Sequence, residues 1–392
     1  MNRHYDVIVV GAGPAGSVAA KFASMGGVSV LLLEKHPVIG YPLCCAEAIS
    51  TTGLSNVVLP DNRWLSSKIE RVKLFGPQNS KALICHPNAG FVLERKIFDR
   101  TLAEQAAAAG ADIRVGVDVI DILRGNDGHL AGVAALNNGR QIEITGKVLI
   151  AADGIESQAA LKAGLVTTQK PGQIHSAYQY LLGGIQIEPE TIEFHIGKES
   201  APGGYVWVFG KGDGLANVGV GISPTKSPNK KAIDYLNEFA GRRFGRYQIL
   251  ERMTGGVPSY VEALPFYKDN LLVCGDAART IDSFTGAGIA NALLSGKLAG
   301  QTAAKMIIEK TGGEEYQREF MKLKGKELKF YYLCRQVYLK LTDDDMVRII
   351  KFAADLFGER PVESINPFEV VAKVILSHPR LITLGRHLLT TR

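Results

Sequence analysis

Residues 5–35 read YDVIVVGAGPAGSVAAKFASMGGVSVLLLEK, and the rest of the chain is organised around this stretch. It opens with an apolar run rich in β-branched residues, Val7–Val10, and passes through GAGPAG into an alanine-rich segment of helical character. A second apolar run, Val28–Leu33, follows and ends on Glu34. The order strand, tight turn, helix, strand is typical of the first unit of a dinucleotide-binding fold. The stretch therefore predicts a parallel sheet with a nucleotide at its edge.

Each glycine of the G-x-G-x-x-G motif has a separate task. Gly11 permits the tight turn, Gly13 lets the backbone approach a pyrophosphate, and Gly16 lets the helix pack on the strand. The first N–H groups of the helix and its positive dipole end face the phosphates. Glu34 ends the second strand, where its carboxylate can accept hydrogen bonds from a ribose. We expect cofactor contacts here from Gly11, Gly13, Ala15, Gly16, Glu34 and Lys35.

Composition narrows the class of protein. The 392 residues exceed one ordinary core, so two or three domains are expected. A net charge of +6 suits an anionic cofactor or membrane surface and is too weak to indicate nucleic acid. No window reaches about 18 uninterrupted apolar residues, and a strand begins within five residues of the start. We therefore expect a cytoplasmic protein, either free or peripheral on the cytoplasmic membrane face. The five cysteines form no Cys/His array with zinc spacing, so no metal site is expected.

Two later motifs complete the first. Asp153-Gly154 ends a buried strand, and Gly275-Asp276-Ala277-Ala278 ends another, with Gly286-Ala287-Gly288 opening a long helix. Asp276 can accept a hydrogen bond from a ribityl hydroxyl, and the helix N-terminus can face a phosphate or a flavin ring. Each motif alone could be a structural turn. The three in order favour a large dinucleotide lying across the sheet.

Between these motifs the hydrophobic pattern changes character. Helical spacing is expected over Arg95–Gly110 and Lys230–Phe244, and everything beyond Thr311 has helical character. Strands are expected over Ile113–Ile122, Leu130–Leu136, Val148–Ala152, Ala177–Ile187, Thr191–Ile196, Gly204–Phe209 and Ala216–Ile222. The segment from Lys35 to Ser50 is expected to be a loop. The layout predicts a nucleotide-binding domain interrupted by a smaller antiparallel sheet.

The three motifs together resemble the FAD-binding signatures of the p-hydroxybenzoate hydroxylase-like flavoproteins. In that superfamily an arginine such as Arg95, at the head of Arg95-x-x-Phe98-Asp99, contacts FAD. Within it, the sequence is most similar to the geranylgeranyl reductase family, over roughly residues 1–310. The similarity is carried by PLCCAE at 42–47, PGGYVWVF at 202–209 and GDAAR at 275–279.

The resemblance implies an α/β fold with a Rossmann-like FAD-binding domain, a smaller antiparallel-sheet substrate domain and a helical C-terminal region. The domains implied are 1–70, 92–165 and 262–311 for FAD, 71–91 and 166–261 for substrate, and 312–392 for the helices. It also adds FAD contacts from Cys45, Ala46, Arg95, Asp153, Gly275, Asp276, Gly286, Gly288 and Ile289.

Three residues are the catalytic candidates: Cys45, Tyr205 and Trp207. The family's Y-x-W-x-F faces a pocket for a polyprenyl chain, and here Tyr205, Trp207 and Phe209 share one side of a strand. The alternative is that this side is domain core. The resemblance places Cys45 beside the flavin, where a thiol could donate a proton or tune the cofactor. The alternative is a buried structural cysteine. Glu47 and His36 are further candidates for proton transfer.

Three functions follow from these features. The first is an FAD-dependent reductase of carbon–carbon double bonds in a polyprenyl, geranylgeranyl-type lipid, with NAD(P)H or a ferredoxin-like protein as reductant. The second is a flavin-dependent monooxygenase or hydroxylase on the same scaffold. The third is a peripheral electron-transfer flavoprotein that passes electrons to quinone, suggested by the basic helical tail at Lys322–Arg335 and Lys340–Arg360. That tail could equally be a solvated helical face.

Overall fold

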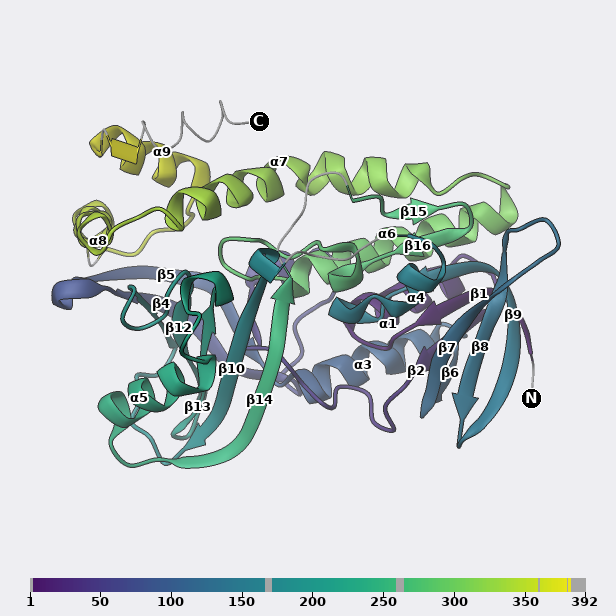
Figure 1. Ribbon diagram of the computed structural model, residues 1–392, viewed down its shortest axis with the longest axis horizontal. Helices are drawn as coiled ribbons and strands as arrows, with labels where there is room; N and C mark the ends of the chain where they lie inside the picture. Colours follow the sequence, from purple (N-terminus) through teal and green to yellow (C-terminus); the bar gives the residue numbers. More distant parts are fainter. Residues whose placement is uncertain (1–2, 166–170, 259–263, 359, 379, 382–392) are drawn as a thin grey trace.

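The computed structural model describes residues 3–165, 171–258, 264–358, 360–378 and 380–381. Two sheets lie side by side, and the C-terminal helices run along the top of both (Figure 1). The predicted fold class is confirmed. The third predicted component, the helical tail, has breaks between its helices and ends outside the described residues.

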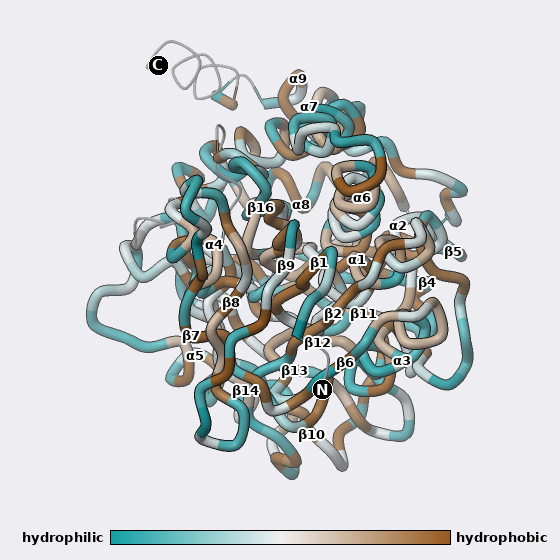
Figure 2. The backbone as a smooth tube through the Cα atoms, turned by 90° about the vertical axis from the view of Figure 1, so that its right-hand side faces the viewer, coloured by the Kyte–Doolittle hydropathy of each residue, from teal (hydrophilic) through white to brown (hydrophobic). Residues whose placement is uncertain are grey.

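The first sheet has the strand order β15-β16-β9-β1-β2-β6, with β8 paired to β9 and β7 to β8. Its strands are β1 (His4–Val10), β2 (Val30–Glu34), β6 (Asp112–Val115), β7 (Val117–Arg124), β8 (Leu130–Asn137), β9 (Arg140–Ala151), β15 (Tyr267–Lys268) and β16 (Leu271–Val273). β16, β9, β1, β2 and β6 run parallel. They carry much of the hydrophobic colour at the centre of Figure 2, as expected for a sheet covered on both faces.

The second sheet has the order β14-β10-β13-β12-β11-β4-β5-β3. Its strands are β3 (Ala48–Ser50), β4 (Leu65–Phe75), β5 (Lys81–Leu93), β10 (Ile174–Gly183), β11 (Thr191–Ile196), β12 (Tyr205–Gly212), β13 (Leu215–Ile222) and β14 (Gln248–Pro258). Its neighbours are antiparallel except β11 and β4, which are parallel. β3 and all of β4 belong to this sheet, whereas the predicted boundary falls at residue 70. The division into domains stays a prediction.

The helices are α1 (Pro14–Met25), α2 (Thr51–Ser55), α3 (Arg95–Ala108), α4 (Gln158–Lys162), α5 (Ala232–Phe244), α6 (Ile289–Ile308), α7 (Glu314–Tyr338), α8 (Asp343–Phe357) and α9 (Pro367–Ser377). α1 packs on α3 and α6, α5 packs on β13 and β10, and α8 packs on β5. α7 runs beside α6 above the first sheet and continues over the second (Figure 1). It therefore connects the two halves of the molecule.

Several element predictions were wrong in detail. The strand expected over 113–122 is two strands, because Gly116 at φ +67° breaks the extended chain between β6 and β7. Strand β14 was not predicted; its alternation is interrupted by charged residues and by Gly255-Gly256. The expected loop at 35–50 ends in strand β3, and the long helix expected from Gly286 begins at Ile289.

Candidate active site

Three strand ends bring the sequence motifs together. In the parallel registers Val10 pairs with Ala151, and Val273 pairs with the same residue. The segments that follow, beginning at Gly11, Ala152 and Cys274, therefore leave the sheet at one carboxyl edge. That edge is where open α/β sheets bind ligands.

At the glycine turn, neighbouring backbone segments lie too close together for a side chain at Gly11 or Gly16. Gly11 has φ +100°, and a Cβ there would lie 2.5 Å from the carbonyl oxygen of Ala152. A Cβ on Gly16 would lie 1.8 Å from the carbonyl oxygen of Gly11, so the helix could not sit this close to the turn. Nothing lies within 4 Å of a Cβ built on Gly13, the residue that caps α1. The backbone at Gly13 therefore faces open space at the helix N-terminus, where a pyrophosphate binds best.

A polar cavity of about 540 Å³ opens beside this turn. Glu34 lines it, but its carboxylate accepts hydrogen bonds from the N–H of Ala12 and of His36, each at 2.9 Å. Lys35 also lines it and bonds to exposed Glu156 at 3.1 Å. His36 contacts Glu34 at 2.7 Å, so its ring lies at this polar end of the site.

Asp153 carries a buried acceptor without a donor. Its Oδ2 accepts a hydrogen bond from the N–H of Ala159 at 2.8 Å, while Oδ1 has no partner among the described residues. Burial raises the pKa of this carboxyl, although the Ala159 N–H opposes the shift. Asp153 lines the polar cavity, so a ligand hydroxyl could satisfy Oδ1.

Arg95 and Asp276 line both this cavity and a second, more apolar one. Arg95 donates two hydrogen bonds of 2.7 Å to Asp99, and these hold its guanidinium in place. Burial opposes the Arg95 charge, but Asp99 together with other nearby groups such as Glu47 outweighs it and raises the arginine pKa. Burial raises the pKa of Asp276, while Arg95 and Arg279 lower it. Gly275, which precedes Asp276, has φ +64° and donates its N–H to Ser295 at 3.0 Å.

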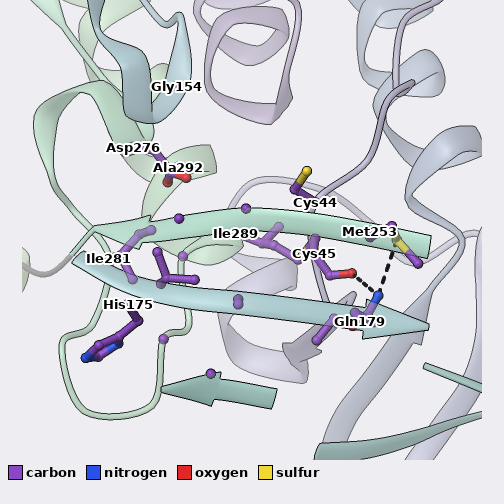
Figure 3. A pocket seen from close by; sticks show the side chains of 18 of the residues that line it. Cys44, Cys45, Gly154, His175, Gln179, Met253, Asp276, Ile281, Ile289 and Ala292 are labelled. Carbon is purple, nitrogen blue, oxygen red and sulfur yellow. Dashed lines mark hydrogen bonds between the residues drawn. The ribbon is translucent and has the colours of Figure 1, made fainter. Parts of the chain in front are cut away.

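The second cavity lies between the two sheets and has a mostly apolar lining (Figure 3). Gly286, Gly288 and Ile289 border it from the start of α6, and Ala15, Cys45 and Ala46 border it from the first half of the chain. Tyr205 and Trp207 of β12 line it as well. Trp207 is also buried, together with Phe209, in a cluster that contains Ile69, Val92 and Ile192. One face of β12 thus supplies both cavity wall and core.

The polar atoms of Tyr205 and Trp207 both donate hydrogen bonds to other groups of the protein. Trp207 donates its indole N–H to Gln179 Oε1 at 2.7 Å, and Tyr205 donates its hydroxyl to the carbonyl of Thr285. Gln179 in turn donates to the carbonyl of Cys45 at 2.9 Å and contacts Met253 (Figure 3). Gln179 was not singled out from the sequence, because a lone glutamine in a strand carries no pattern. It joins β10, β12 and the cysteine loop.

The adjacent cysteines have different surroundings. The N–H of Glu47 donates to Cys45 Sγ at 3.2 Å, and burial raises the pKa of this thiol. Cys44 is exposed and donates its thiol to the carbonyl of Thr254 at 2.9 Å. A thiol with a raised pKa is protonated at neutral pH. The Cys45 thiol therefore keeps its proton at neutral pH.

Glu47 is a structural anchor for this loop. One carboxylate oxygen accepts from the N–H of Arg95 at 2.8 Å, and the other accepts from Lys211 and from Asn217. Lys211 also lies 3.0 Å from Glu94. With both oxygens bonded and only 2% of its surface exposed, Glu47 does not face the apolar cavity.

Comparisons with known proteins agree with this geometry. A family model described as the geranylgeranyl reductase catalytic domain matches residues 173–257, and an NAD(P)-binding Rossmann-like domain matches residues 9–48. A digeranylgeranylglycerophospholipid reductase of Methanosarcina acetivorans is 38% identical over 97% of this chain and 95% of its own. One from Methanocella arvoryzae is also 38% identical, over 97% and 98%.

The chain belongs to the geranylgeranyl reductase family. A solved geranylgeranyl bacteriochlorophyll reductase-like protein of Thermoplasma acidophilum superposes with a TM-score of 0.90 at 32% identity, covering 99% of this chain and all of that one. The halogenase CndH superposes with a TM-score of 0.70 at 18% identity, over 96% of this chain and 97% of its own, which shows a shared fold alone.

The predicted family, the reductase class and the cofactor FAD are confirmed. The cleft also fits this cofactor on its own terms. Gly13 leaves room at a helix N-terminus for a pyrophosphate, and Asp153 Oδ1 has no donor within the described part of the chain. The polar cavity adjoins the apolar one through shared residues, so a polar dinucleotide end and a flat ring can occupy the two together.

Proposed function

We propose that this reductase saturates carbon–carbon double bonds in the geranylgeranyl chains of a glycerophospholipid. The apolar cavity between Cys45, Tyr205 and Trp207 carries this proposal, because it adjoins the dinucleotide cleft and suits a long hydrocarbon. The names of its relatives give the lipid class. Neither a monooxygenase nor a quinone-directed electron carrier is favoured by these relatives.

FAD is proposed to be held along the shared carboxyl edge. The proposed contacts are Gly11, Gly13, Ala15, Gly16, Glu34, Lys35, Cys45, Ala46, Arg95, Asp153, Gly275, Asp276, Gly286, Gly288 and Ile289, all of which line one of the two cavities except Gly16. Gly16 acts through packing, since its hydrogen lets α1 meet the turn. Reduced FAD supplies the hydride when bound.

The chain's own residues then have two tasks. An isolated alkene is a poor hydride acceptor, so the site must exclude water and deliver a proton to the second carbon. Tyr205 and Trp207 form an apolar wall that excludes water. The Cys45 thiol is protonated, half-buried and at the cavity surface, so we assign it the proton.

The reductant and the membrane contact are also proposals. No helix among the described residues is long and apolar enough to cross a membrane. A lipid substrate requires access to a membrane, so we propose peripheral contact at the cytoplasmic face, supported by the net charge of +6. NAD(P)H or a ferredoxin-like protein is the proposed electron donor.

The mass of the lipid after the reaction tests the proposed activity. Holoenzyme reduced chemically is incubated with a digeranylgeranylglycerophospholipid, and the lipid is analysed by mass spectrometry. We expect a gain of two hydrogens for each saturated bond; an unchanged lipid with fully reduced enzyme would refute the activity.

Paired cysteine variants test the proton assignment. Cys45→Ala should lower the rate by about 100-fold, the usual contribution of a positioned acid, with FAD content unchanged. Cys44→Ala should stay near wild type, since its thiol bonds to a backbone carbonyl.

A further inference from the structure

Arg335 is a buried cation at the wall of the apolar cavity. It lies in the last turn of α7, and only 4% of its surface is exposed. Its Nη1 donates to the carbonyl of Gly203 at 2.7 Å, and its Nη2 donates to Nε2 of His175. The sequence predicted only a basic helical tail here, and this side chain was not singled out.

No carboxylate among the described residues forms an ion pair with Arg335. Asp282, the acid that influences the neighbouring Tyr205, is occupied: it accepts from the N–H groups of Phe284 and Thr285 and from the Thr285 hydroxyl. A buried charge without a counter-charge is costly, and a ligand of opposite charge would remove that cost.

His175 does not compensate the charge. Burial, followed by the nearby Arg335, lowers the pKa of His175 to about 3, so the ring is neutral and accepts a hydrogen bond. A guanidinium has five N–H donors. Two are used in the bonds to Gly203 and His175, which leaves three without a protein acceptor among the described residues. Burial lowers the pKa of Arg335 to about 10, so it remains charged at neutral pH.

Arg335 lies apart from the charged residues that line the polar, dinucleotide end of the cleft. The other charged residues of the apolar cavity are Arg95 and Asp276, which also line the polar cavity, and Arg95 is paired with Asp99. Arg335 lines the apolar cavity and is not part of the lining of the polar cavity. Figure 3 shows its partner His175 at the left of the view, Cys45 near the centre and Met253 toward the right.

We propose that Arg335 binds the phosphate of the lipid substrate and so holds the prenyl chains in register along the cavity. This rests on the proposed function. Arginine is suited to phosphate because its fork of donors can meet two oxygens at once. With the head group held at one end, the hydrocarbon extends toward Cys45 and Trp207.

A purely structural role is the competing explanation. Three residues further along α7, Tyr338 donates its hydroxyl to the carbonyl of Gly204, next to the carbonyl that Arg335 bonds. Tyr338→Phe therefore removes a similar bond between the helix and the same loop without changing charge. It is the matched control for Arg335→Gln.

The experiment measures binding of two probes to the oxidised holoenzyme by calorimetry. The probes are digeranylgeranylglyceryl phosphate and the same diether alcohol without phosphate. We expect wild type and Tyr338→Phe to prefer the phosphate lipid by about tenfold or more, the scale of a charge-assisted bond. Arg335→Gln should bind both probes equally, with its affinity for the alcohol within about twofold of wild type. Arg335→Lys should recover part of the preference, and the flavin spectrum reports folding.

Each other outcome has a separate meaning. A preference that survives in Arg335→Gln, or is lost equally in Tyr338→Phe, overturns the phosphate assignment while the reductase function stands. Equal binding of both probes by wild type does the same. Inorganic phosphate alone binding as tightly as the lipid would mark a free-anion site and overturn the lipid assignment. If wild type neither binds nor reduces either lipid, the proposed function fails and this proposal with it.

Discussion

Cys44 and Cys45 are adjacent in sequence but differ in exposure and in hydrogen bonding. Burial raises the pKa of both thiols, and the charge of Arg95 opposes this shift at Cys45. The thiolate is the reactive form, so a raised pKa lowers reactivity at neutral pH and makes it rise with pH. Exposure then decides which thiol a reagent reaches.

We expect iodoacetamide to modify Cys44 before Cys45 in folded holoenzyme, by about tenfold or more in rate. Both rates should increase as the pH is raised from 7 to about 9, because a raised pKa keeps each thiol protonated over the lower part of that range. Peptide mass spectrometry after timed quenching measures both sites. Equal rates at the two sites would contradict the lower exposure of Cys45.

Lys211 neutralises buried carboxylates beside the cysteine loop. Its side chain is 7% exposed and that of Glu47 is 3% exposed. Lys211→Met should lower the free energy of unfolding by about 3 kcal/mol or more, because Glu47 would remain as a buried charge. Denaturant unfolding measures this loss.

Lys73 provides a control for the Lys211 variant, because it forms an ion pair with an exposed carboxylate. Lys73→Met removes the pair with Glu188, whose side chain is 54% exposed, and should cost at most about 1 kcal/mol. Adding Glu47→Gln to Lys211→Met should restore part of the stability. A cost no larger than that of Lys73→Met would show that the Glu47 network is solvated.

At the scale of elements, α1 and α6 pack through glycines. A Cβ on Gly300 of α6 would lie 2.2 Å from the carbonyl oxygen of Ala19, and one on Gly296 would lie 2.2 Å from that of Ala15. Since Ala15 and the start of α6 both border the apolar cavity, this close contact sets how the cavity's walls face one another. The spacing of the two helices is therefore part of the site.

Gly300→Ala should destabilise the protein by about 1–3 kcal/mol, because the backbone of α1 must move away. Gly241 of α5 is the control, since nothing lies within 4 Å of a Cβ built there. Gly241→Ala should instead stabilise by about 0.5–1 kcal/mol through helix propensity. Thermal unfolding of both variants gives the comparison, and a stabilising Gly300→Ala would show that the helices are not held at this distance.

At the scale of the whole molecule, the apolar cavity lies between the two sheets. The apolar cavity takes residues from α1, α6, β10, β12, β14 and α7, so its occupants contact elements from both halves of the chain. Binding to the folded state alone stabilises it by mass action. FAD should therefore stabilise the two sheets together.

Removing FAD should lower the unfolding temperature. Restoring FAD at a free concentration of roughly 100 times its dissociation constant should raise the free energy of unfolding by about 2.7 kcal/mol. Differential scanning calorimetry of apo and reconstituted protein measures the change. Asp276→Ala should reduce it at the same FAD concentration, since Asp276 lines both cavities. Identical transitions with and without FAD would contradict a cofactor shared by the two sheets.

Local sequence patterns were sufficient to predict many of the strands, helices and motifs. The glycine motif with its flanking apolar runs predicted β1, α1 and β2, because each glycine meets a steric need of the turn itself. The strand-end motifs at Asp153 and Gly275 and the alternation of β11–β13 were recognisable for the same reason. The family resemblance then supplied FAD and the reductase class, which the relatives confirm.

Tertiary structure alone decided which side chains meet. Gln179 joins Trp207 to the Cys45 loop across 134 residues of sequence, and Arg335 reaches His175 across 160. Neither residue belongs to a periodic pattern, since contacts between distant segments depend on how the sheets and α7 pack. The same packing occupied both polar groups of Tyr205 and Trp207 and both carboxylate oxygens of Glu47. Sequence identified the motifs that line the two cavities, and the fold determined which of their side chains keep a polar atom free of protein partners.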